Sequence, residues 1–137
     1  MAAELSEEEL DAARRRDVAE RAETVDTLLR QNKYAEALLE SLQNPPVGAS
    51  DPDIKSENAD IVFRALGAAT KALDGKEMKE LVKGFAADDA DTLTKYVYRG
   101  LSDPKGDSSS LLKMQNMISS VRGLGTIQRT VMARQTV

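Results

Sequence analysis

The chain has 137 residues, a net charge of -4, and no cysteine, histidine or tryptophan. Its length fits one ordinary domain. The missing cysteine and histidine exclude a disulfide framework, a thiolate metal site and the usual general base at neutral pH. Any catalysis would have to use carboxylates, Lys, Ser, Thr or Tyr, which removes most reaction classes.

The N-terminal segment carries the signals of a capped helix. Ser6 can accept a hydrogen bond from the amide of Glu9, and Leu5 can pack on Leu10 as a hydrophobic staple. A helix is therefore expected to begin at Ser6. Leu5 and Leu10 are also candidates for contact with a partner protein.

An apolar stripe follows on a helical period, starting at Val18 and continuing through Ala22, Val25 and Leu29. The preceding stretch 11–17 is polar and is expected to face solvent. A helix with so little apolar surface gains little from packing. We therefore predict an N-terminal helical arm over residues 1–24, a possible partner tether, and a helical body over residues 25–137.

Apolar residues recur with helical spacing in six further segments, 34–42, 52–73, 78–85, 88–101, 111–121 and 126–134. Turn residues separate them, and these include Pro45-Pro46, Asp74-Gly75, the loop 102–110 and the glycines at 123 and 125. Nothing alternates with the period of a strand. The sequence predicts an all-α fold, a compact multi-helix domain of about seven helices with the N-terminal helical arm.

No motif for chemistry emerges from the remaining residues. The carboxylates at 7–9 and 88–91 stand where helix N-termini favour negative charge. The glycines at 123 and 125 follow no strand and precede no lysine in the position that a phosphate loop requires. We predict no catalytic residue, no cofactor-binding residue and no metal ligand.

The sequence also indicates where the protein resides. Four glutamates occupy residues 1–10, where a signal peptide would need a basic and then an apolar stretch. The longest uncharged run, 41–50, is ten residues, whereas a spanning helix needs about 20 apolar residues. An intracellular protein with no membrane span is expected.

Charge is unevenly distributed along the chain. Residues 1–110 hold 15 basic and 23 acidic side chains, a net charge of -8, while residues 111–137 carry a net charge of +4 and no acid. The four C-terminal cations are Lys113, Arg122, Arg129 and Arg134. Spaced cations without interleaved aromatic residues do not predict nucleic-acid binding. They can instead complement an acidic protein, which makes Arg122, Arg129 and Arg134 interface candidates.

Tyr96 and Tyr98 are the remaining interface candidates. They stand two residues apart on a predicted helix, so both cannot face the same core. One of them can serve as an outward anchor at a protein interface. Alternatively, each packs in the core against a different neighbouring helix.

Several motifs resemble subunit five of the actin-related protein 2/3 complex, over roughly residues 25–137. They are Leu28-Leu29, the run Tyr34-Ala35-Glu36-Ala37-Leu38, Asn44-Pro45-Pro46, Lys95-Tyr96-Val97-Tyr98-Arg99-Gly100, Gly123-Leu124-Gly125-Thr126-Ile127 and Ala133-Arg134-Gln135-Thr136-Val137. The resemblance implies an all-α, non-catalytic subunit of an assembly that nucleates branched actin filaments in the cytoskeleton.

The same resemblance implies partners. The helical body would pack on the β-propeller subunit and on subunit four, and the N-terminal segment would reach the actin-related protein 2. Animal members of the family begin with an acidic, extended segment, whereas this chain opens with a capped helix. The alternative function is a free-standing helical adaptor that binds short peptides in a groove.

Overall fold

The computed structural model describes residues 6–103, 108–122 and Val137. Within these ranges the chain forms six helices and no strand, as the apolar spacing predicted. The helices are α1 (Glu7–Arg30), α2 (Tyr34–Ser41), α3 (Pro52–Ala72), α4 (Gly75–Lys83), α5 (Ala87–Leu101) and α6 (Ser108–Arg122). The seventh helix expected over 126–134 lies outside the described residues.

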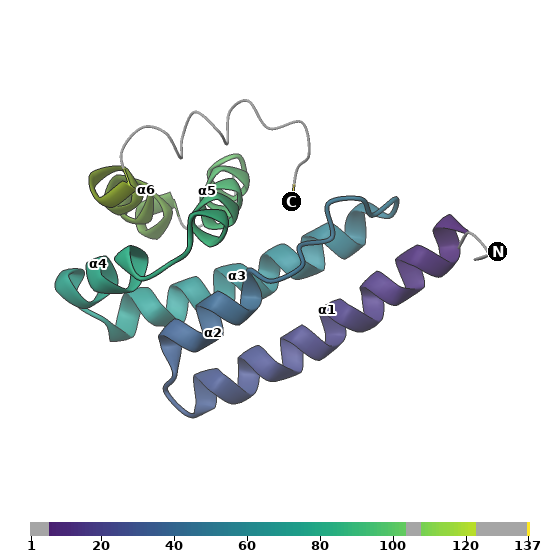
Figure 1. The fold of residues 1–137 in the computed structure, drawn as a ribbon, viewed down its shortest axis with the longest axis horizontal. Coiled ribbons are helices and arrows are strands. Elements are labelled where there is room, and N and C mark those ends of the chain that lie inside the picture. The colour runs from purple at the N-terminus through teal and green to yellow at the C-terminus, as the bar shows by residue number, and fades with distance from the viewer. Residues whose placement is uncertain (1–5, 104–107, 123–136) are drawn as a thin grey trace.

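Helices α1, α2 and α3 pack on one another. Helix α5 packs on the other side of α3, and α6 packs against α5 and α4 (Figure 1). Helix α1 begins as predicted, because the Ser6 side chain accepts a hydrogen bond from the Glu9 amide. It then continues without a break to Arg30, so the expected boundary between residues 24 and 25 falls inside one helix. Helix α4 closes the end of the molecule away from the N-terminus.

Helix α3 lies at the centre of the fold. Asp51 caps it and Pro52 occupies its first turn, where a missing N–H costs nothing. Its buried side chains lie between α1 and α2 on one side and α5 on the other, which explains its broad apolar face. They are Ile54, Asn58, Ala59, Ile61, Val62, Ala65, Leu66 and Ala69.

Gly100 on α5 lies close to both neighbouring helices. A Cβ atom added at Gly100 on α5 would lie 2.6 Å from Leu111 Cδ1 and 3.1 Å from the Phe63 ring. A carbon 2.6 Å from Leu111 Cδ1 would force that side chain to shift, so the glycine lets α5 sit against both α3 and α6 without displacing it.

Two helix starts differ from the sequence expectation. Helix α6 begins at Ser108, although 102–110 was expected to be loop. Helix α4 begins at Gly75, three residues before the predicted apolar run, because Asp74 and Glu77 form a capping box. In both places the first residues of the helix are polar. The sequence pattern therefore predicted a loop, because polar residues add nothing to an apolar stripe.

Candidate functional site

The part of the chain that the structure describes contains no group of three carboxylates that could hold a metal ion. None of its helices is long and apolar enough to cross a membrane. The candidate functional features of this part of the chain are therefore of two kinds. They are the polar clusters that hold the helices to one another and the side chains that remain exposed on the surface.

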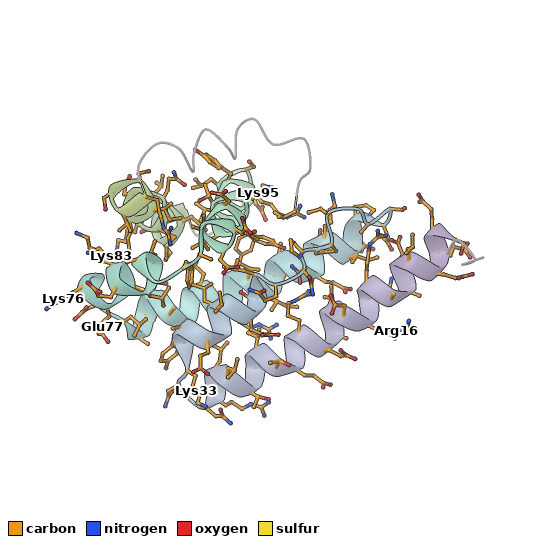
Figure 2. The ribbon with its side chains drawn as sticks, in the orientation of Figure 1. Arg16, Lys33, Lys76, Glu77, Lys83 and Lys95 are labelled. Carbon is orange, nitrogen blue, oxygen red and sulfur yellow. The ribbon has the colours of Figure 1, made fainter. Side chains whose placement is uncertain are left out.

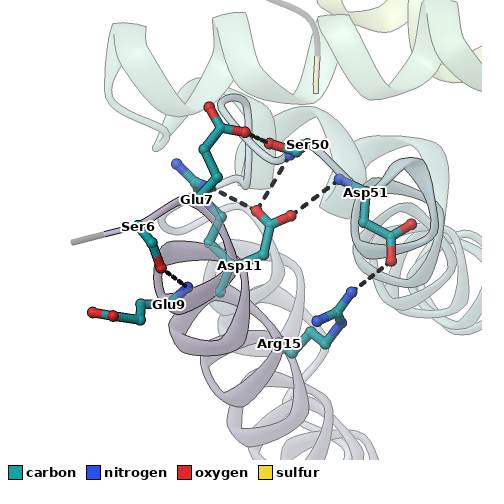
Figure 3. Close-up of polar contacts among 8 residues, drawn as sticks. Ser6, Glu7, Glu9, Asp11, Arg15, Ser50 and Asp51 are labelled. Carbon is teal, nitrogen blue, oxygen red and sulfur yellow. Dashed lines mark hydrogen bonds and ion pairs between the residues drawn. The ribbon is translucent and has the colours of Figure 1, made fainter.

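The start of α1 is held to the start of α3 by a group of five residues, here called the Asp11 cluster: Glu7, Asp11, Arg15, Ser50 and Asp51 (Figure 3). The Asp11 carboxylate accepts hydrogen bonds from the amides of Ser50 and Asp51, both at 3.2 Å. Arg15 pairs with Asp51 at 2.5 Å, and the Ser50 hydroxyl donates to Glu7. The first turns of α1 are thus fastened to the body of this chain.

These contacts change the ionisation of two carboxyls. Partial burial pushes the pKa of Asp11 upward, but hydrogen bonds from Arg14, Ser50 and Asp51 outweigh that effect and hold the pKa below its usual value. The pKa of Asp51 is also lowered, chiefly by the hydrogen bond from the Asp53 amide and then by Arg15. Both carboxylates are therefore ionised at neutral pH.

A second polar group crosses the core. It is a series of hydrogen-bonded residues, here called the Arg21 chain: Asp17, Arg21, Asn44, Asn58 and Tyr96. Arg21 on α1 is only 4% exposed, and its guanidinium donates to Asn58 Oδ1 at 2.6 Å, to Asp17 at 2.7 Å and to the Asn44 carbonyl at 3.1 Å. The Asn58 amide in turn donates to the hydroxyl of Tyr96 on α5. Burial raises the pKa of the Tyr96 phenol above its usual value. Side chains from α1, α3 and α5 are thus joined through a satisfied, buried network.

The structure separates the predicted interface residues. Leu5, Arg129 and Arg134 lie outside the described residues, and Leu10 is on the surface, 37% exposed. Tyr96 is wholly buried, whereas Tyr98 is half-buried on another side of α5. Arg122 ends α6 by donating to the carbonyls of Val82, at 3.1 Å, and Phe85. The four described candidates come from three different helices, α1, α5 and α6.

Sequence reasoning missed the buried polar residues. The stretch 11–17 was expected to face solvent, yet Asp11 is 6% exposed because its carboxylate caps backbone amides. Two signals could have found the Arg21 chain. Asn58 interrupts the apolar face of α3 four residues after Ile54 and four before Val62, and Arg21 follows Val18 by three residues on the buried side of α1.

The architecture is that of an all-helical domain whose buried polar groups hold helices together. The whole chain, residues 1–137, matches the model of the family described as ARP2/3 complex 16 kDa subunit (p16-Arc). The chain belongs to this family.

Its relatives include subunits of the same complex from distant organisms. The chain is 34% identical over 128 residues to actin-related protein 2/3 complex subunit 5 of Dictyostelium discoideum, across 93% of this chain and 88% of that protein. It is 32% identical over 114 residues to the human actin-related protein 2/3 complex subunit 5-like protein, across 82% and 72% of the two chains. Identity to subunit 5-C of Xenopus laevis is 30% over 114 residues, across 82% and 73%.

Proposed function

We propose that this chain is a non-catalytic structural subunit of the actin-related protein 2/3 complex and supports nucleation of branched actin filaments by packing on other subunits. The observation that carries the proposal is the family match over residues 1–137, with relatives that are named as subunit 5. The protein would then act in the cytoplasm, at actin-rich structures.

The helical body is proposed to pack on the β-propeller subunit and on subunit four. Such a role needs a rigid surface, and the Arg21 chain supports one because it fixes α1, α3 and α5 relative to one another. Tyr98, half-buried on α5, is a candidate anchor on that surface.

The N-terminal residues 1–24 are proposed to reach the actin-related protein 2. The Asp11 cluster and buried Val18 hold α1 against the body of this chain. We therefore propose that the exposed first turn, with Glu8, Glu9 and Leu10, makes that contact while the helix stays docked. The possible tether is then an outer face of the docked helix α1.

Affinity purification of the tagged chain from the cells that make it tests the main proposal. A constitutive subunit is recovered with the other subunits of the complex in a fixed one-to-one ratio that survives extended washing. Recovery of the chain alone, or with partners that exchange freely during the washes, would contradict the proposal and favour an adaptor that binds short peptides.

A further inference from the structure

A pocket of about 290 Å³ lies where the end of α3 meets α4 and α6. Figure 1 shows these helix ends on the side of the molecule away from the N-terminus. We call it the methionine pocket. Its lining residues are Thr70, Lys71, Leu73, Gly75, Met78, Ser110, Lys113, Met114 and Met117. Methionine side chains are unbranched and polarisable, so they adapt to the shape of an inserted apolar group.

The rim of the methionine pocket is positively charged. Lys71 and Lys113 line it and are both exposed, while no lining residue is a carboxylate. Helix α6 contains no aspartate or glutamate at all, although the chain as a whole has a net charge of -4. Within the described residues, no ion pair involves either lysine.

The two acids that follow Lys71 most closely in the sequence, Asp74 and Glu77, are occupied elsewhere. The Glu77 amide donates to Asp74 at 2.8 Å, and the Asp74 amide donates to Glu77 at 3.3 Å. This capping box holds both acids at the N-terminus of α4. The pocket therefore combines an apolar, deformable floor with two cations that these acids do not neutralise.

We propose that the methionine pocket binds an acidic segment of another subunit, which inserts one apolar side chain against Met117 and sets its carboxylates beside Lys71 and Lys113. The proposal rests on the proposed function, because it takes the partner from the same assembly. Charge complementarity selects an acidic occupant, and an apolar group that fills a desolvated pocket supplies most of the affinity.

Charge reversal tests the rim. The complex assembled without this chain is titrated with fluorescently labelled chain, and anisotropy reports the dissociation constant. Lys71→Glu/Lys113→Glu should weaken binding by about tenfold or more, and the binding of this variant should depend less on salt than that of the wild type. Thermal unfolding of the variant confirms that it folds.

The matched control is Lys33→Glu/Lys83→Glu, which changes the net charge equally. Both lysines are exposed and lie outside the pocket, at the start of α2 and on α4 (Figure 2). Binding of the control should stay within about twofold of wild type. Equal weakening by the two double variants, or none by either, would overturn the assignment of the pocket.

The pocket floor is tested at Met117, which is half-buried. Met117→Glu should weaken binding by at least tenfold, while the volume-conserving Met117→Leu should leave it nearly unchanged. A photo-crosslinking residue at position 117 should link, in the assembled complex, to an apolar residue flanked by aspartate or glutamate. A cross-link to a neutral or basic segment would refute the proposal. Failure of the wild-type chain to join the complex would refute the proposed function itself, and this inference with it.

Discussion

Replacing Arg21 by methionine tests whether the buried polar chain holds α1 to the rest of the fold. The substitution removes the guanidinium and keeps an unbranched side chain in the same space. It leaves Asn58 Oδ1 without its donor at 2.6 Å and frees the Asn44 carbonyl, which accepted at 3.1 Å. Asn58 is 0% exposed, so water does not reach its oxygen in place of the lost donor.

The magnitude follows from the groups that lose partners. A hydrogen bond from a charged donor contributes about 1.5–3 kcal/mol, and a buried acceptor left unsatisfied costs about 1–3 kcal/mol. Burial of the methionine offsets part of this loss, as in other replacements of buried ionic groups by apolar ones. We expect Arg21→Met to lower the free energy of unfolding by about 2–4 kcal/mol, which for a chain of this size lowers the melting temperature by about 10 °C.

Urea and thermal unfolding followed by far-ultraviolet circular dichroism measure the effect. Arg16→Met is the matched control, because Arg16 is on the same helix and exposed, and its replacement should change stability by less than about 0.5 kcal/mol. Tyr96→Phe combined with Arg21→Met should cost less than the sum of the single changes, since both act through Asn58. Equal stability of the Arg21 and Arg16 variants would show that the buried hydrogen bonds of Arg21 do not hold α1 to the fold.

Three further predictions concern other contacts. Wild type should be more stable than Asp11→Asn, and this difference should be complete above pH 3.8, the unperturbed pKa of the carboxyl. The difference should vanish as the pH falls through the lower pKa that Asp11 has in the folded protein. Urea unfolding across this pH range measures it. Asp74→Ala should lower the free energy of unfolding by about 1 kcal/mol through loss of the cap, whereas an unchanged value would argue against the capping box. Tyr98→Ala should weaken assembly with partners more than it lowers stability, and Tyr96→Ala should lower stability more than it weakens assembly. Binding and melting are measured in parallel, and an equal loss of stability in both variants would contradict this prediction.

Much of the fold could be predicted from local patterns. The apolar spacing of α3, the cap at Ser6 and the prolines at 45 and 46 each depend on neighbours a few residues away, and each predicted its element correctly. The starts of α4 and α6 were harder, because a helix can begin with polar residues that add nothing to an apolar stripe.

The polar clusters could not be predicted in the same way. Asp11 meets the amide of Ser50, 39 residues away, and Arg21 meets Asn58 across 37 residues. No local spacing encodes such pairs, because they exist only after α1 and α3 have packed together. The sequence therefore predicted that the stretch 11–17 of this helix faces solvent, whereas Asp11 within it attaches α1 to the start of α3.

Nucleation of branched filaments offers the most direct test of the proposed role. Complex assembled without this chain is mixed with actin and an activating factor, and branch density is counted by fluorescence microscopy before and after the purified chain is added back in equal ratio. We expect few branches without the chain and restored branching with it. Equal branch density in the two samples would contradict a structural role in nucleation.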